Sequence, residues 1–240
     1  MPELQIDALV FDVLGTLVDE PAGIRGGIQE LAPSLDEATT DVLLTRWQEH
    51  IDHESRRVLA GGRPYATTEA LDREAARIVA EAAGVEDPTA VATLALAGRR
   101  LPPWPDTVAG LARLAERFPL IGLSNASRSA LLGLNAHAGL RWHQVLSAEE
   151  ARTYKPDPAV YQLAVTASGA PPERLLMVAA HAWDLRGAQA LGLRTAYVAR
   201  PVGDAPAPSD RFDVYADDLT DLAVQLDKAQ GLSSGERPTG

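Results

Sequence analysis

Residues 8–20, ALVFDVLGTLVDE, decide the organisation of this 240-residue chain. The four residues Ala8–Phe11 are apolar and strand-forming, which is typical of a parallel strand covered on both faces, and Gly15 permits a tight exit. Asp12 therefore stands at the carboxyl end of the predicted strand. Ligands bind at that end in open α/β sheets, so its carboxylate is a candidate nucleophile or metal ligand. The alternative is a turn aspartate that accepts backbone hydrogen bonds.

The composition predicts a globular protein with a sizeable core, because 46% of the residues are hydrophobic. The absence of cysteine excludes disulfides, thiolate metal sites and cysteine nucleophiles. A net charge of −11 opposes binding to nucleic acid or to an anionic membrane surface, so we expect a small-molecule partner. No stretch approaches the roughly 20 apolar residues of a membrane span, and the first residues do not resemble a signal peptide. The expected location is the cytoplasm.

A helical pattern follows the first strand. From residue 20 to about residue 100, apolar residues recur at spacings of three and four, most clearly over Glu37–Leu59 and Thr68–Ala83. The prolines of 101–105, LPPWP, end this pattern. Beyond them, predicted strands alternate with helices, which indicates a parallel sheet with right-handed crossovers. The strands are expected at 120–123, 144–147, 175–179 and 195–198, and the helices at 107–117, 128–138, 158–168 and 183–191.

The predicted fold class is therefore α/β, with a doubly wound, Rossmann-like parallel sheet. Residues 1–19 and 101–228 would form this core domain, and residues 20–100 a helical cap inserted directly after the first strand. An insertion at that point lies above the carboxyl edge of the sheet, over Asp12. Residues 229–240 are polar and rich in Gly, Ser and Pro, which predicts a disordered tail.

Polar residues also follow later predicted strands. Ser124 and Asn125 come directly after 120–123, where they could hold an anion or leaving group, or could cap the next helix. Lys155 precedes a helix start, a position where a surface lysine is the usual outcome.

His181 and Asp184 lie three residues apart in the turn after the strand at 175–179. They are either site residues or an ordinary polar histidine and a helix-capping aspartate. What favours a site is the joint pattern, in which each polar motif follows its own strand.

In this order, the motifs FDVLGTL, LSNAS, YKPDPAVY and AAHAWD resemble those of the haloacid dehalogenase (HAD) superfamily, and within it the type II L-2-haloacid dehalogenases. The resemblance covers essentially the whole chain, including the helical cap. It implies that Asp12 attacks the substrate and that Lys155 keeps the attacking carboxylate ionised. The implied activity is hydrolysis of small L-2-haloalkanoic acids to D-2-hydroxy acids through an aspartyl ester, in a homodimer.

The resemblance also implies roles for other residues. Asp184 would position the water that hydrolyses the ester, and His181 would replace the groups that order this water in the family. Hydrogen-bond donors to the substrate carboxylate or the departing halide would be Thr16, Ser124 and Asn125.

The expected substrate-binding wall departs from the family pattern. The family's cap arginine follows a tryptophan, but here Trp47 is followed by Gln48 and preceded by Arg46. Leu14 stands where the family has tyrosine. The anchor for the substrate carboxylate therefore stays open, with Arg46 and Gln48 as candidates. The aromatic residues expected to line the pocket, or alternatively to belong to the core, are Trp183, Tyr161, Trp47 and Tyr65.

Two alternatives to the dehalogenase remain. A HAD-type metal-dependent phosphatase would need an acid at the position of Leu14, and Asp12 and Asp184 with one backbone carbonyl would make a weak magnesium site. A HAD-fold binding protein with little catalysis is favoured by Ala179 and His181, which replace water-ordering groups. We prefer the dehalogenase, which needs neither acid nor metal because halide leaves without a proton. We therefore expect no metal and no cofactor.

Overall fold

A six-stranded, fully parallel sheet forms the centre of the computed structural model, which describes residues 5–231. The strand order is β3-β2-β1-β4-β5-β6, which confirms the predicted α/β, Rossmann-like fold class. The strands are β1 (Ala8–Phe11), β2 (Leu120–Ser124), β3 (Gln144–Ser147), β4 (Leu175–Ala179), β5 (Arg194–Val198) and β6 (Val214–Ala216). The edge strand β6 was not predicted from the sequence.

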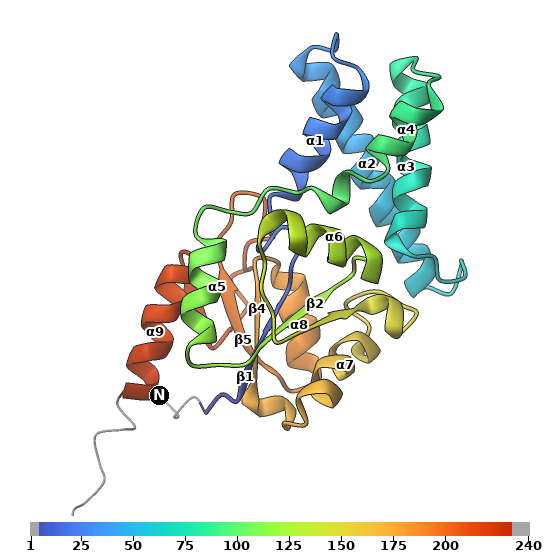
Figure 1. Ribbon diagram of the computed structural model, residues 1–240. Helices are drawn as coiled ribbons and strands as arrows, with labels where there is room; N and C mark the ends of the chain where they lie inside the picture. The colour runs from blue at the N-terminus through green and yellow to red at the C-terminus, as the bar shows by residue number, and fades with distance from the viewer. Residues whose placement is uncertain (1–4, 232–240) are drawn as a thin grey trace, which may run out of the picture.

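Helices cover both faces of the sheet (Figure 1). One face carries α5 (Thr107–Ala115), α6 (Arg128–Ala138) and α9 (Leu219–Gly231), and the other carries α7 (Pro158–Ser168) and α8 (Ala182–Ala190). Short 3₁₀ helices occur at η1 (Ala97–Arg99), η2 (Ala148–Glu150) and η3 (Pro172–Arg174).

The central strand β1 is buried on both sides, as its four apolar residues predict. Leu9 and Phe11 pack into the core under α5, α6 and α9, and Ala8 and Val10 pack into the core under α7 and α8. This alternation follows from the two-residue period of a strand. A strand held this way places Asp12, the next residue, at a fixed point on the carboxyl edge.

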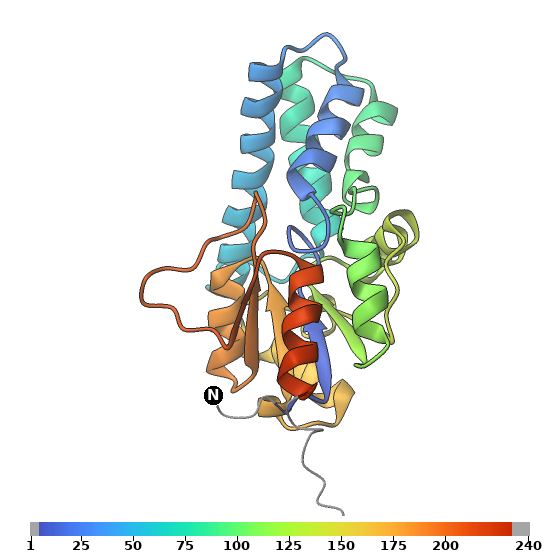
Figure 2. The same ribbon diagram turned by 90° about the vertical axis from the view of Figure 1, so that its left-hand side faces the viewer.

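A bundle of four helices stands above that edge (Figures 1 and 2). It contains α1 (Glu20–Leu31), α2 (Glu37–Leu59), α3 (Thr68–Ala83) and α4 (Pro88–Leu94). The amphipathic pattern expected for α2 and α3 is present, since Leu43 and Trp47 are buried on α2 and Leu71, Ala75 and Val79 are buried on α3. The start of α2 is capped by Asp36, whose carboxylate accepts a 2.7 Å hydrogen bond from the Thr39 N–H.

The chain crosses between the sheet and the bundle twice, and the two crossings lie side by side. The Asp19 N–H donates to the Pro102 carbonyl at 2.8 Å, and the Trp104 N–H donates to the Leu17 carbonyl at 3.1 Å. The Thr107 hydroxyl also donates to the Leu17 carbonyl, at 2.8 Å. The outgoing and returning segments are therefore bonded to each other at the sheet edge.

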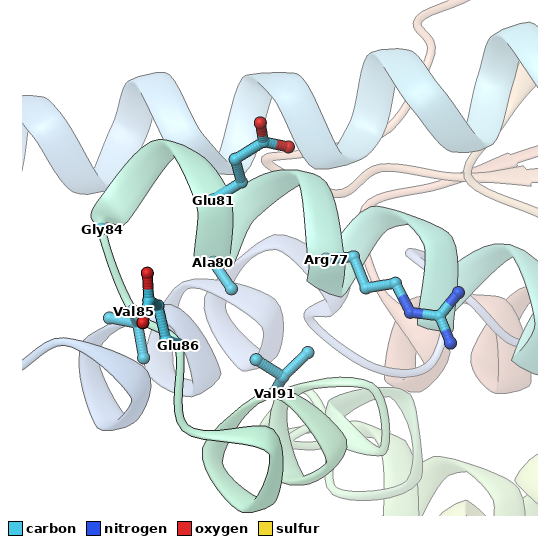
Figure 3. Close-up of a pocket in the computed structure, with 7 residues that line it drawn as sticks. All are labelled: Arg77, Ala80, Glu81, Gly84, Val85, Glu86 and Val91. Atoms are coloured by element: carbon cyan, nitrogen blue, oxygen red, sulfur yellow. The ribbon is translucent and has the colours of Figure 1, made fainter.

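An open groove of about 310 Å³ lies on the outer part of the bundle, between α3 and α4 (Figure 3). Its lining residues are Arg77, Ala80, Glu81, Gly84, Val85, Glu86 and Val91. None of them lines the cavity above Asp12 that is described below. The groove is therefore separate from the candidate site.

Helix α9 extends to Gly231, so it runs into the segment 229–240 that was predicted to be a tail. The rest of that segment, residues 232–240, lies outside the described residues. Within residues 5–231, no helix combines the length and the apolarity that a membrane crossing requires.

Candidate active site

The candidate site lies where the strand order reverses, between β1 and β4. The chain runs from β1 to β2 on one side of the sheet and later to β4 on the other side. Asp12 follows β1 and His181 follows β4, and the Asp12 N–H donates to the Val178 carbonyl at 3.0 Å. Such a reversal point is the usual ligand site in open α/β sheets.

Three side chains hold the Asp12 carboxylate. Lys155 Nζ lies 3.0 Å from Oδ1, the Thr16 hydroxyl donates to Oδ2 at 2.7 Å, and His181 Nδ1 lies 3.3 Å from Oδ2. Burial alone would raise the pKa of Asp12, but Lys155, His181 and Thr16 together hold this pKa well below its ordinary value. The structure therefore presents an ionised, oriented carboxylate.

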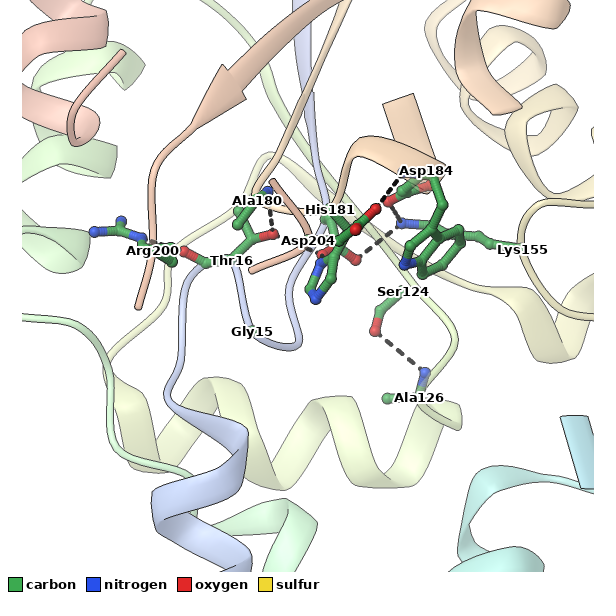
Figure 4. A network of polar contacts seen from close by, with 12 residues as sticks. Gly15, Thr16, Ser124, Ala126, Lys155, Ala180, His181, Asp184, Arg200 and Asp204 are labelled. Carbon is green, nitrogen blue, oxygen red and sulfur yellow. Dashed lines mark hydrogen bonds and ion pairs between the residues drawn. The ribbon is translucent and has the colours of Figure 1, made fainter. Parts of the chain in front are cut away.

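Lys155 bridges two carboxylates at the carboxyl edge (Figure 4). Its Nζ also lies 2.7 Å from Oδ2 of Asp184, and its side chain is 1% exposed. Burial alone would lower the pKa of Lys155, but the charges of Asp12 and Asp184 raise it. Its backbone N–H donates to Oδ1 of Asn125 at 2.8 Å, so the main chain of the lysine is also held.

Asp184 and Tyr161 do not lie where the sequence placed them. Asp184 is fully buried, and its second oxygen, Oδ1, accepts a 2.7 Å hydrogen bond from the Tyr161 hydroxyl. Burial raises the pKa of Asp184, and the neighbouring Asp12 charge acts in the same direction. Neither side chain lines the cavity: Asp184 contacts Lys155, and Tyr161 contacts Asp184.

Thr16 also differs from its predicted role. Its hydroxyl is buried, donates to Asp12 and accepts a 2.9 Å hydrogen bond from the Ala180 N–H. Because both directions of the hydroxyl are in use, Thr16 holds the Asp12 carboxylate and is not a donor to the substrate.

Gly15 meets two requirements at the turn after β1. Its φ of +76° lies in the left-handed region, and a Cβ on this residue would lie 2.6 Å from Cε1 of His181. The glycine therefore makes room for the imidazole beside Asp12. Burial would lower the pKa of His181, but the hydrogen bond and charge of Asp12 raise it, which favours the imidazolium while Asp12 is ionised.

A second layer of contacts, which the sequence did not reveal, fixes the turn itself. Arg200 Nε donates to the Thr16 carbonyl at 2.9 Å (Figure 4). Its guanidinium also forms two hydrogen bonds with Asp106, at 2.7 and 2.9 Å. Trp104 Nε1 donates to the Gly15 carbonyl at 3.0 Å. These residues come from the returning segment and from the loop after β5, far from Asp12 in sequence.

A cavity of about 180 Å³ lies above Asp12, between the sheet edge and the bundle. The predicted site residues that line it with Asp12 are Leu14, Ser124, Asn125, His181 and Trp183. Residues that the sequence did not single out also line it, namely Glu20, Ser55, Thr68, Asp72 and Tyr154. The Ser124 hydroxyl accepts a 3.2 Å hydrogen bond from the Ala126 N–H at the start of the α6 turn.

A larger groove of about 600 Å³ adjoins this cavity, and Trp47, Gln48, Arg56 and Lys155 are among its lining residues. Gln48 is therefore at the approach to the cavity. Arg46 is exposed on α2 and lines neither space, because the buried face of the helix carries Trp47, about 100° away. Of the two candidate anchors for the substrate carboxylate, only Gln48 lies near the cavity, and Arg46 does not.

Comparison with known proteins gives a consistent family. The family described as haloacid dehalogenase-like hydrolase matches residues 6–192. (S)-2-haloacid dehalogenase H-109 of Pseudomonas putida is 32% identical over 200 residues, which are 81% of this chain and 86% of the relative. The (S)-2-haloacid dehalogenase of Xanthobacter autotrophicus is 34% identical over 199 residues, which are 81% of this chain and 76% of the relative.

Solved structures agree. A crystal structure of an L-2-haloacid dehalogenase has a TM-score of 0.85 and 35% identity, and covers 93% of this chain and 99% of its own. The L-2-haloacid dehalogenase of X. autotrophicus with chloropropionic acid covalently bound has a TM-score of 0.79 and 27% identity, and covers 92% of this chain and 98% of its own. With this family match and these relatives on the same fold, the chain belongs to the haloacid dehalogenase-like hydrolases, among relatives named (S)-2-haloacid dehalogenases.

Proposed function

We propose that this protein hydrolyses small L-2-haloalkanoic acids to D-2-hydroxy acids through an ester on Asp12. The observation that carries this function is the ionised Asp12 carboxylate, held by Lys155, Thr16 and His181 at the floor of a small cavity. A volume of about 180 Å³ is close to the 150 Å³ cavity that accepts benzene, so the substrate has about six heavy atoms. The relative with covalently bound chloropropionic acid supports both the size and the ester.

In the first step, an Asp12 oxygen attacks C2 of the substrate from the side opposite the halogen. The new C–O bond forms as the carbon–halogen bond breaks, and the halide leaves with the bonding electrons. Attack from behind inverts C2. Lys155 contributes by keeping the attacking oxygen charged, and Thr16 and His181 contribute by fixing the carboxylate plane.

In the second step, water attacks the carbonyl carbon of the Asp12 ester. The bond between that carbon and the substrate oxygen breaks, the Asp12 carboxylate is restored, and the substrate oxygen takes up the proton released by the water and leaves as the hydroxyl of the hydroxy acid. His181 is the group beside Asp12 that can accept the proton of this water, since Asp184 is buried behind Lys155. Ester formation removes the Asp12 charge that raises the pKa of His181, and burial then lowers that pKa and favours the neutral base. Lys155 Nζ, 3.0 Å from Oδ1 of Asp12, stabilises the negative charge that develops on the carbonyl oxygen of the ester.

The helical bundle completes the site. We propose that residues 20–100 act as a cap over a core of residues 1–19 and 101–228, because Glu20, Ser55 and Asp72 of the bundle line the same cavity as Asp12. Closure of such a cap would exclude water while the ester forms.

The donor set does not fit the magnesium site of a HAD-type phosphatase. The Lys155 ammonium stands between Asp12 and Asp184, where a cation shared by these carboxylates would have to lie. Leu14 offers no acid for a phosphoryl leaving group. The side chains present therefore favour dehalogenation.

The deciding experiment compares halide release from (S)- and (R)-2-chloropropionate with phosphate release from p-nitrophenyl phosphate, each with EDTA or magnesium. We expect chloride from the (S) isomer in EDTA, and none from Asp12→Asn, which keeps the size of the side chain. Magnesium-dependent phosphate release without chloride release would overturn the proposed function.

A further inference from the structure

Two carboxyl groups line the bundle side of the cavity that contains Asp12. Glu20 is the first residue of α1, and Asp72 lies on α3. No described residue forms a hydrogen bond or ion pair with either side chain. Neither arginine nor lysine occurs among the described residues that line this cavity.

This wall lies on the side toward which the proposed attack by Asp12 would send the leaving group. Attack by Asp12 from behind C2 directs the departing halide away from the sheet edge, toward the bundle. A halide that leaves toward two ionised carboxylates would be repelled, whereas a carboxylic acid can donate a hydrogen bond to it. The protonation state of this wall therefore determines whether it hinders or assists departure.

The surroundings of Glu20 raise its pKa, so its acid form persists up to about pH 6. Burial raises the pKa of Glu20 to about 6, with the His181 charge opposing and the Asp12 charge adding to the rise. The other charged groups that share the cavity or the adjoining groove with Glu20 are Asp72, Lys155, Asp52 and Arg56. Arg56 pairs with Asp52 at 2.5 Å and is exposed, so it does not neutralise Glu20.

The pKa of Asp72 is raised in the same direction as that of Glu20. Burial raises its pKa well above the ordinary value, and the charges of Glu20 and Glu69 add to this effect, while Arg73 opposes it. The two carboxyl groups therefore disfavour each other's ionisation.

We propose that the Glu20 carboxylic acid donates a hydrogen bond to the departing halide, with Asp72 as a second such donor. This inference rests on the proposed dehalogenation. As the Asp12 oxygen bonds to C2 and the carbon–halogen bond breaks, the halide takes the bonding electrons and the proton stays on Glu20. The Glu20 acid would thus take the place of the cap arginine, which follows the tryptophan in the family, whereas Gln48 follows Trp47 here.

The test compares Glu20→Gln and Glu20→Ala with the unmodified protein, by kcat for 2-chloro- and 2-bromopropionate between pH 5 and 9. We expect kcat of the unmodified protein to fall above about pH 6, as Glu20 ionises. Glutamine still donates but cannot ionise, so Glu20→Gln should lack this fall. Glu20→Ala should lose activity at every pH, and about tenfold more for chloride than for bromide, because chloride is the poorer leaving group.

The control is Asp52→Asn, which removes an exposed carboxylate of the groove and should leave the pH profile unchanged. A Glu20→Gln profile that keeps the same fall above pH 6 would overturn the inference. So would a Glu20→Ala variant with an unchanged preference between chloride and bromide. Asp72→Asn serves as a second variant and should reduce the fall above pH 6.

A binding measurement separates this inference from the proposed function. Line broadening of ⁸¹Br in NMR reports bromide binding without turnover. We expect broadening that disappears above about pH 6 in the unmodified protein, persists in Glu20→Gln and is absent in Glu20→Ala. Glu20-dependent binding without any halide release from 2-haloacids would overturn the function but support the donor wall. Halide release with binding that ignores Glu20 would overturn the donor wall alone.

Discussion

Lys155 Nζ lies 2.7 Å from Oδ2 of Asp184, a shorter contact than its 3.0 Å contact with Oδ1 of Asp12. The fully buried Asp184 is therefore the nearer of the two carboxylates that share the ammonium. Tyr161 completes this chain of contacts from behind, through its 2.7 Å hydrogen bond to Asp184. Tyr161 and Asp184, which do not line the cavity, thus hold the Lys155 ammonium beside the Asp12 carboxylate.

Asp184→Asn should lower kcat by about 10- to 150-fold, the equivalent of one charge-assisted hydrogen bond of about 1.5–3 kcal/mol. The amide keeps the size of the side chain but no longer holds the ammonium by charge. Steady-state kinetics on 2-chloropropionate check this, with Tyr161→Phe as the matched control that removes one hydroxyl and should have a smaller effect. An Asp184→Asn variant with unchanged kcat would show that Lys155 needs no such support.

Lys155→Met should move the acidic limb of the pH–rate profile to higher pH. Lys155 holds the pKa of Asp12 down, and without it burial raises this pKa, so ionised nucleophile is present only at higher pH. Leaving two buried carboxylates without their cation should also lower the free energy of unfolding by about 3–5 kcal/mol at pH 7.

The sign of the pH dependence of stability should reverse in the same variant. In the unmodified protein the lowered pKa of Asp12 contributes stability above its unfolded value, which is lost as the pH falls. In Lys155→Met the raised pKa contributes stability at low pH, which is lost as the pH rises. Urea unfolding from pH 4 to 8 measures the free energy of unfolding of both proteins. If this free energy depended on pH in the same way in the two proteins, the buried ion pair would be contradicted.

His181→Gln should release about one halide per enzyme molecule rapidly and then slow. The first step needs only the Asp12 carboxylate, whereas the second needs the base, so the ester should accumulate. Mass spectrometry of the peptide containing Asp12 would detect the bound acyl group. Trp183→Phe, which keeps His181, should show no accumulation, and a steady rate without a burst in His181→Gln would assign the proton to another group.

Gly15→Ala should destabilise the protein more than Gly61→Ala. Both glycines have a positive φ, +76° and +71°, so both variants bear the left-handed cost of about 1–2 kcal/mol. Only at Gly15 does the added Cβ meet a side chain, His181 at 2.6 Å, while nothing lies within 4 Å at Gly61. The difference in midpoint of thermal unfolding isolates the clash, and equal shifts would mean that the imidazole moves aside freely.

Sequence patterns predicted the core well because buried parallel strands are continuous apolar runs. The strand at Ala8–Phe11 and the helix at Glu37–Leu59 are examples with matching bounds. β6 escaped prediction because it is a three-residue edge strand with an exposed Tyr215, which leaves no apolar run to detect.

The candidate site was predicted less completely, for a different physical reason. Motifs identify which residue types follow a strand but not which direction each hydroxyl or carboxylate faces, so Thr16 and Asp184 were assigned to substrate and water. Glu20 and Asp72 were missed because a charged residue on an amphipathic helix ordinarily faces solvent. Arg200 contacts Thr16 across 184 residues of sequence, a distance that no local pattern spans.

The paired crossings between sheet and bundle form the junction at which the proposed cap would turn. The hydrogen bonds between Asp19 and Pro102 and between Trp104 and Leu17 tie the outgoing and returning segments together, so neither can turn alone. Rotation of the bundle would then be confined to the chain beyond these bonds, and the turn from Asp12 to Thr16 would stay with the sheet. A bundle that opened as the proposed cap would therefore admit substrate and release product without realigning Asp12.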